Sequence, residues 1–278
     1  MKLGITTNVF AGPLKNKEID LEGIVSMAGE LRLASVEIRD DPAVLDPSRV
    51  RSLVSLALAS GMSLSYAVKN DMFGKDDRLL FERAVRLASE CGPGTVLRLL
   101  ASQDALKAEG KNGYSAEDVE KLRSIMEEYG RVAAGSGVVL AIENARDPLY
   151  GREGYFGMAD LMRSVTAENV GLTFDPANAT NFSLCKSPSG EDEVLRFVDE
   201  LGRRIKLTHY KTTSSGVVQT TIGTADVDNE ALLLRLSKVF SGTLCIEIPG
   251  SPGLSDTIAS VESSISYLNA RGLSKYLA

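Results

Sequence analysis

Short β-prone runs alternate with longer amphipathic stretches eight times along this 278-residue chain. A strand that is followed each time by a helix predicts a parallel sheet with crossover helices. The expected strands are 3–6, 35–39, 63–68, 95–100, 138–143, 170–175, 205–211 and 242–248. The helices expected to follow them are 19–33, 46–61, 76–90, 115–134, 158–165, 192–201, 228–240 and 254–268.

Eight such units in a chain of this length favour a closed (β/α)8 TIM barrel that forms a single α/β domain over residues 1–278. The alternative is an open doubly wound sheet. That fold needs a glycine fingerprint after its first strand, and the sequence there is NVFAGPLKN rather than GxGxxG. The unit count therefore decides for the barrel.

Composition excludes several classes of partner. The formal net charge of −6 argues against nucleic acid, because contact with a phosphate backbone needs a basic surface. No apolar run approaches the length of a membrane-spanning helix, so we expect no membrane partner. The three cysteines, Cys91, Cys185 and Cys245, are widely spaced and match no zinc signature. This usage favours a reducing, cytoplasmic location.

Four consecutive strands each end in an ionisable residue of inward-facing parity. These residues are Glu143, Asp175, His209 and Glu247, and His209 is the only histidine of the chain. Because side chains alternate along a strand and barrel active sites lie at the carboxyl ends of the strands, we expect the four to share one ring at the barrel mouth.

Three carboxylates in one ring repel one another, and a divalent cation removes that repulsion. Oxygen ligands with one imidazole suit Mn²⁺ first, with Mg²⁺, Co²⁺ and Zn²⁺ as alternatives. Two other interpretations stay open. The histidine can be a packed core residue, and the carboxylates can cap helices or pair with Lys211 or Arg98.

The same residues carry a resemblance to a known family, the sugar phosphate isomerases/epimerases with a xylose isomerase-like barrel. It covers nearly the whole chain and is strongest in the stretches AIEN (141–144), GLTFDPAN (171–178), THYK (208–211), IGTADVD (222–228) and CIEI (245–248). The resemblance implies that Glu143, Asp175, His209 and Glu247 hold one divalent metal ion. The lysine of the family's histidine-x-lysine motif falls on Lys211.

The chain departs from the family pattern among the substrate-binding residues. Asn178 stands where sugar epimerases of the group often have histidine, and Thr212 where aspartate often follows the lysine. We expect metal-stabilised enediolate chemistry with Glu143 and Glu247 as the acid/base pair. The residues expected to bind substrate are Lys211, Asn178, Glu37, Arg39 and Arg98. An internal ion-pair network is the alternative for the last three.

The leading hypothesis is an isomerase or epimerase of a sugar, sugar phosphate or related keto-polyol. A dehydroshikimate- or inosose-type dehydratase is the second, with Arg39 and Arg98 holding a substrate carboxylate from a keto-acid. A non-catalytic sugar-binding barrel is the third. The long loop 176–192 is predicted to act as a lid. Tyr150, Tyr155 and Phe156 are expected either to wall the pocket or to pack under that lid. The sequence leaves association into homo-oligomers open.

Overall fold

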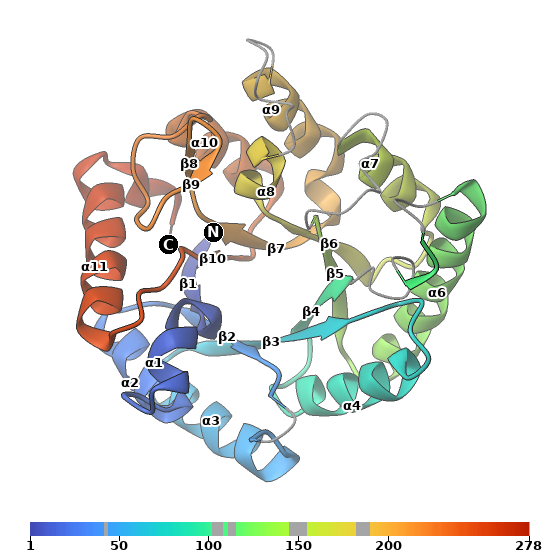
Figure 1. The fold of residues 1–278 in the computed structure, drawn as a ribbon, viewed down its shortest axis with the longest axis horizontal. Helices are drawn as coiled ribbons and strands as arrows, with labels where there is room; N and C mark the ends of the chain where they lie inside the picture. The colour runs from blue at the N-terminus through green and yellow to red at the C-terminus, as the bar shows by residue number, and fades with distance from the viewer. Residues whose placement is uncertain (42–43, 102–107, 111–114, 145–154, 182–189, 278) are drawn as a thin grey trace.

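The protein is a closed parallel β-barrel surrounded by helices (Figure 1). The computed structural model describes residues 1–41, 44–101, 108–110, 115–144, 155–181 and 190–277. The strands pair in the order β1-β10-β7-β6-β5-β4-β3-β2, which closes the ring. Their bounds are β1 Lys2–Thr6, β2 Ser35–Arg39, β3 Ser63–Asn70, β4 Val96–Ala101, β5 Val139–Glu143, β6 Val170–Phe174, β7 Ile205–Tyr210 and β10 Thr243–Ile246. The predicted barrel and its eight strands are confirmed.

Helices surround the barrel on its outside, as the prediction required (Figure 1). They are α2 Leu21–Glu30, α3 Pro47–Ala59, α4 Asp77–Ser89, α6 Ala116–Gly135, α7 Tyr155–Ser164, α9 Gly190–Leu201, α10 Asn229–Val239 and α11 Leu254–Ala270. Within the described residues, no helix is both long and apolar enough to cross a membrane.

Polar caps fix where several helices begin. The Asp46 side chain accepts from the Arg49 amide, and Pro47 follows as the first helical residue of α3. Ser115 and Asp118 form a reciprocal capping box at α6. Asp228 accepts from the Ala231 amide at α10. Each cap accepts from a backbone amide that has no partner within the first turn. Such a cap stabilises the protein by about 1 kcal/mol.

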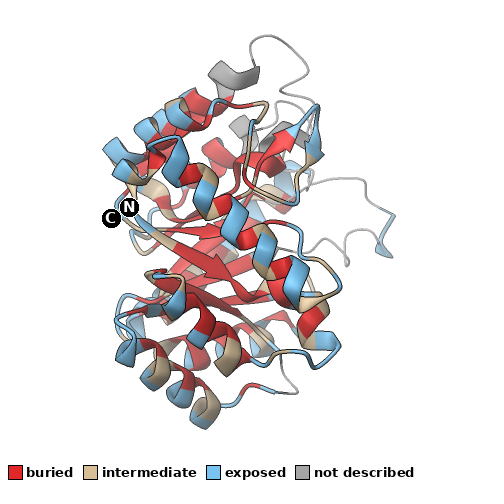
Figure 2. Ribbon diagram, turned by 90° about the vertical axis from the view of Figure 1, so that its left-hand side faces the viewer, coloured by how far each residue is buried: buried red, intermediate tan, exposed pale blue. Residues whose placement is uncertain are grey.

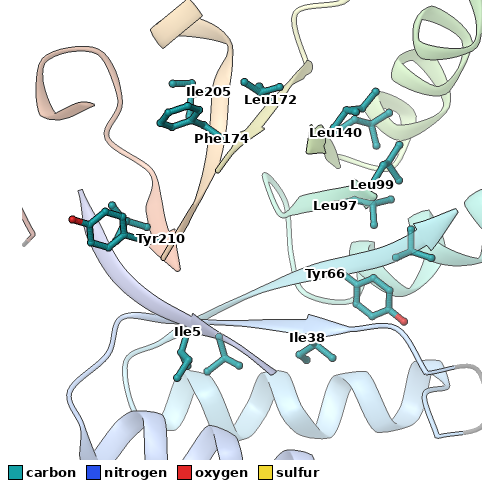
Figure 3. Close-up of a cluster of buried hydrophobic side chains, with 14 of the residues drawn as sticks. Ile5, Ile38, Tyr66, Leu97, Leu99, Leu140, Leu172, Phe174, Ile205 and Tyr210 are labelled. Carbon is teal, nitrogen blue, oxygen red and sulfur yellow. The ribbon is translucent and has the colours of Figure 1, made fainter. Parts of the chain in front are cut away.

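The main apolar core lies between the barrel and the helices. Figure 3 shows its outward-facing strand residues, which include Ile5, Ile38, Tyr66, Leu97 and Phe174. The helices cover them with their buried faces and turn their exposed faces outward (Figure 2). The barrel therefore closes through apolar packing outside it, which leaves its interior available for polar residues.

The barrel interior changes character from one end to the other. Small residues form part of the interior near the strand starts, where Gly4 lies opposite Ser35 on the neighbouring strand. Ala67 and Ala141 occupy the middle, where they lie opposite Arg98 on β4 from either side. Charged residues gather at the strand ends, so the fold concentrates its inward-facing chemistry there.

One predicted facing is wrong. Strict alternation along β7 back from the inward-facing His209 predicts Ile205 on the inner face, but β7 carries a bulge: Leu172 pairs with Ile205 whereas Thr173 pairs with Leu207. The extra residue is Lys206. Ile205 therefore packs with Leu172 and Phe174 outside the barrel (Figure 3), while Leu207 and His209 keep the predicted inward facing.

The loops contain further elements that the strand–helix pattern did not predict. They are η1 Thr7–Phe10, α1 Ala11–Lys15, α8 Pro176–Asn181, η4 Gly202–Arg204, the hairpin of β8 Thr213–Ser214 with β9 Val217–Val218, and η5 Leu273–Tyr276. α8 is the first part of the predicted lid. Residues 182–189 of that lid and Tyr150 lie outside the described residues. The chain ends meet where the Met1 amino group donates to the Tyr276 carbonyl at 3.1 Å.

Candidate metal centre

Four predicted ligands meet at the carboxyl ends of neighbouring strands. Glu143 ends β5, Asp175 follows β6 directly, His209 lies on β7, and Glu247 follows β10 directly. One ligand-type atom from each lies within 4.8 Å of the others, and all four residues are buried. The spacing of one strand–helix unit between ligands thus becomes a ring at one end of the barrel. Such a group could hold one metal ion.

Glu37 sets the orientation of His209. Both carboxylate oxygens of Glu37, on β2, lie 3.1 Å from His209 Nε2, and neither side chain is exposed to solvent. The other ring nitrogen, Nδ1, faces Glu143 Oε1 at 3.4 Å and Glu247 Oε2 at 3.2 Å. A carboxylate on one nitrogen directs the lone pair of the other toward a ligand position.

Two cations balance the carboxylates. Arg98 on β4 donates to Glu143 Oε2 at 2.7 Å, and its Nε lies 3.4 Å from Glu37. Lys211 Nζ lies 2.5 Å from Asp175 Oδ2 and 2.7 Å from Glu247 Oε2. The interpretation of Glu37 and Arg98 as an ion-pair network is therefore observed. A contact of either one with substrate stays a prediction.

Asp175 is held by the start of α8 and by an asparagine that the sequence argument gave no role. Its Oδ1 accepts from the amides of Ala177 at 2.9 Å and Asn178 at 3.2 Å. The Asn144 side chain makes two hydrogen bonds with the Asp175 backbone. Its Nδ2 donates to the Asp175 carbonyl at 2.8 Å, and its Oδ1 accepts from the Asp175 amide at 2.6 Å. The signal for Asn144 was its position directly after Glu143.

The protonation states follow from these contacts. Burial favours a neutral Glu247, but His209 and Lys211 outweigh it and hold its pKa well below the ordinary value. Burial likewise opposes ionisation of Glu143, and Arg98 then lowers its pKa. Burial would lower the pKa of His209, but Glu247, Glu37 and Glu143 together raise it well above 6.5. Without a metal ion, His209 is therefore an imidazolium at neutral pH.

Asp175 behaves differently from the two glutamates. Burial raises its pKa, and Lys211 offsets that rise only in part. Burial would lower the pKa of Lys211, but Asp175 and Glu247 raise it. The lysine is thus a fixed cation beside two of the four candidate ligands.

The buried charges match one divalent ion. Glu37, Glu143, Asp175 and Glu247 face Arg98, Lys211 and the His209 imidazolium, which leaves one net negative charge when all are ionised. A divalent cation that displaces the imidazole proton brings the sum to zero. His209 Nδ1 is also buried, and its contacts with the described residues do not have hydrogen-bond geometry. The residues present therefore fit a bound metal ion.

The remaining predicted residues lie around this ring. Asn178 donates to Glu143 Oε1 at 3.2 Å. Arg39 on β2 lies farther out, where its Nη1 donates to the side chain of Asn8, and Asn8 in turn donates to Glu247 Oε1 at 3.4 Å. Asn8 was missed because it lies in η1, which the sequence pattern did not predict. Arg39 and Asn8 both line a cavity of about 1060 Å³, and the hydrogen bond from Asn8 to Glu247 links that cavity to the ring.

Comparison with known proteins agrees with this geometry. The family model described as xylose isomerase-like TIM barrel matches residues 43–271. By sequence, no curated protein matches the chain. A structure titled IOLI protein with a binding zinc atom superposes with a TM-score of 0.74 at 17% identity and covers 100% of both chains.

Two solved sugar epimerases share the fold over their whole length. D-psicose 3-epimerase with D-tagatose, from Clostridium cellulolyticum H10, has a TM-score of 0.72 at 14% identity and covers 100% of this chain and 99% of that chain. D-allulose 3-epimerase in complex with D-allulose, from Methylomonas sp., has a TM-score of 0.69 at 16% identity and covers 98% and 96%. At these identities the likeness establishes a common fold.

Proposed function

The chain belongs to the xylose isomerase-like TIM barrel family, and we propose that it is an isomerase or epimerase of a sugar or related keto-polyol that uses one divalent metal ion. The observation that carries the proposal is the buried ring of three carboxylates and one imidazole at the barrel mouth. Structures titled as sugar 3-epimerases share the complete fold, which supports the same substrate class.

Glu143, Asp175, His209 and Glu247 would hold the metal ion. Mn²⁺ is the first candidate, and Mg²⁺, Co²⁺ and Zn²⁺ are the alternatives. When bound, the ion supplies Lewis acidity toward a carbonyl and a neighbouring hydroxyl of the substrate. Glu37 holds the imidazole of His209 in place, and the Asn178 amide fixes one oxygen of Glu143.

Glu143 and Glu247 are suited to acid/base work because they face His209 from different strands. Both carboxyls have a lowered pKa, so in the metal-free protein each is an ionised carboxylate, the form that a proton acceptor must have. Isomerisation needs one of them to carry a proton between adjacent carbons of the substrate. Epimerisation needs one to remove a proton and the acid form of the other to return one on the opposite face.

Substrate specificity would reside in the cavity beside β1 and β2. Its lining residues include Arg39, Asn8, Lys15, Lys17 and Asp20. This mixture of donors and acceptors suits the hydroxyl groups of a polyol. Lys211, next to Glu247, would bind a substrate oxygen.

The dehydratase alternative receives less support. It requires Arg39 and Arg98 to hold a substrate carboxylate together. Arg98 is 2% exposed and pairs with Glu143 and Glu37, whereas Arg39 lies in the neighbouring cavity. The two guanidinium groups are therefore engaged in different environments.

The test is to load the protein with Mn²⁺ and incubate it in D₂O with a panel of ketopentoses, ketohexoses and keto-inositols. An isomerase or epimerase incorporates solvent deuterium at carbon and forms a new sugar, which NMR detects. Glu143→Gln and Glu247→Gln should each lose this exchange, and the exposed-site control Lys275→Met should retain it. A dehydratase would instead give a product that has lost water. Tight sugar binding without deuterium exchange would contradict catalysis.

A further inference from the structure

A second cavity lies at the opposite end of the barrel, where the strands begin. Its volume is about 510 Å³, which is within the range of small-molecule sites. We call it the floor cavity and define it by six of its lining residues, Ser35, Ser65, Thr95, Arg203, Lys206 and Thr243. The metal ring, which is the group of candidate ligands Glu143, Asp175, His209 and Glu247, lies at the other ends of the same strands. The proposed function therefore gives the floor cavity no role.

The charges on the floor cavity are of one sign. Arg203 and Lys206 line it, and no aspartate or glutamate is among its described lining residues. Its third ionisable group is Cys91, where burial raises the thiol pKa to about 12 and keeps it neutral. Glu168 raises the pKa of Lys206, but it does not line the cavity.

The bulge in β7 brings Lys206 into the cavity. In a regular strand this lysine would alternate outward, but it is the extra residue between the pairs Leu172–Ile205 and Thr173–Leu207. Its aliphatic chain lies across Gly171, where an added Cβ would be only 2.6 Å from Lys206 Cγ and 2.9 Å from Cε. The glycine therefore provides the room in which the lysine lies inside the barrel.

Two polar groups in the cavity have no hydrogen-bond partner among the residues that the structure describes. The Lys206 ammonium makes no hydrogen bond or ion pair with any residue in the described part of the chain. Ser65 is 6% exposed, and its hydroxyl likewise makes no hydrogen bond with a described residue. Burial and the nearby Arg204 lower the pKa of Lys206 by more than Glu168 raises it. An anion in the cavity would satisfy both groups.

We propose that the floor cavity is a binding site for a phosphate dianion, either free or as the monoester of a small metabolite. Lys206 and Arg203 supply the opposite charge, and the hydroxyl groups of Ser65 and Ser35 supply neutral donors. Charged donors with several hydroxyls around one tetrahedral anion are the usual means of phosphate recognition. The cavity is larger than one phosphate group, so a small organic moiety can also enter.

The first test locates the ligand on the wild-type chain. Trace acetylation with acetic anhydride, followed by peptide mass spectrometry, reports the reactivity of each lysine. With EDTA present to keep the metal ring empty of metal ions, millimolar phosphate should slow acetylation of Lys206 severalfold. Lys2, which is exposed near the same end and does not line the cavity, should react at an unchanged rate. Equal Lys206 rates with and without phosphate or glycerol 3-phosphate would overturn the proposal.

The second test measures affinity by calorimetry on variants. Lys206→Met keeps the aliphatic chain over Gly171 and removes the charge, so we expect phosphate binding to weaken about tenfold or more. Lys2→Met is the matched control and should bind as the wild type does. Tighter binding of glycerol 3-phosphate than of phosphate identifies a monoester as the ligand, and equal binding identifies free phosphate. Unchanged affinity in Lys206→Met would contradict the assignment.

Discussion

Replacing Glu37 by glutamine tests how the protein prepares His209 for a metal ion. The substitution keeps the shape of a side chain that has no solvent exposure and removes its charge. The glutamine oxygen can still accept from His209 Nε2. It no longer provides the paired carboxylate oxygens that lie 3.1 Å from that nitrogen. The negative charge of Glu37 on β2 therefore strengthens the His209 imidazole on β7 as a metal ligand.

The size of the effect follows from the kind of hydrogen bond that is lost. A hydrogen bond to a charged group contributes about 1.5–3 kcal/mol, and a neutral one about 0.5–1.5 kcal/mol. The expected loss is about 1–2 kcal/mol, which corresponds to about 5- to 30-fold in the metal dissociation constant. Glu37 also raises the pKa of His209, so its loss weakens the competing proton. A divalent ion carries twice the charge of a proton, so metal affinity falls overall.

The assay is calorimetric titration of the metal-free protein with Mn²⁺. Asp77→Asn is the matched control, because Asp77 is a buried carboxylate that accepts from Asn70 at 3.0 Å and from Tyr129, away from the ring. It should bind Mn²⁺ as tightly as the wild type. The loss of one charge-assisted hydrogen bond should change the Mn²⁺ dissociation constant by more than about twofold. A dissociation constant of Glu37→Gln within that range of the wild-type value would refute the proposed role of Glu37.

Three further results are expected. Because the pKa of His209 in the metal-free protein lies well above 6.5, Mn²⁺ binding near pH 7 should release about one proton, and the affinity for Mn²⁺ should rise with pH up to that pKa. Calorimetric titrations in buffers of different ionisation enthalpy measure the proton release. Binding without proton release would mean that the imidazole is already neutral. Gly171→Ala should lower the free energy of unfolding in urea by about 3 kcal/mol, since the new Cβ would lie 2.1 Å from the Arg204 carbonyl; wild-type stability would contradict that close approach. Asp228→Ala should cost about 1 kcal/mol by the same measurement and Asp228→Asn less, because only the first removes the acceptor for the Ala231 amide.

The barrel and the ring of four candidate ligands could be predicted because both depend on local patterns. Alternation of strand and helix fixes the number of units, and side-chain parity fixes which strand residues face inward. Glu143, Asp175, His209 and Glu247 satisfy both rules, and their side chains meet as expected. Parallel strands place their carboxyl ends at one edge, so four independent strand ends suffice to define one site.

Other features depend on contacts that no local pattern contains. Glu37 shares the inward parity, but its hydrogen bond to His209 joins β2 and β7, which are not neighbours in the barrel. Nor does the sequence of β7 reveal its bulge, so parity gave the wrong facing for Ile205 and no role for Lys206. Asn8 reaches Glu247 only because η1 forms after β1. Each of these contacts is a consequence of closing the barrel.

The central claim is that four side chains from four strands hold one divalent ion. Elemental analysis of the protein after growth with manganese tests it most directly, with His209→Ala and the control Asp77→Asn purified in parallel. The account predicts about one metal ion per chain in the wild type and in Asp77→Asn, and loss of the ion in His209→Ala. A folded wild-type protein that contains no metal ion and takes up none on addition of Mn²⁺, Mg²⁺, Co²⁺ or Zn²⁺ would contradict the claim.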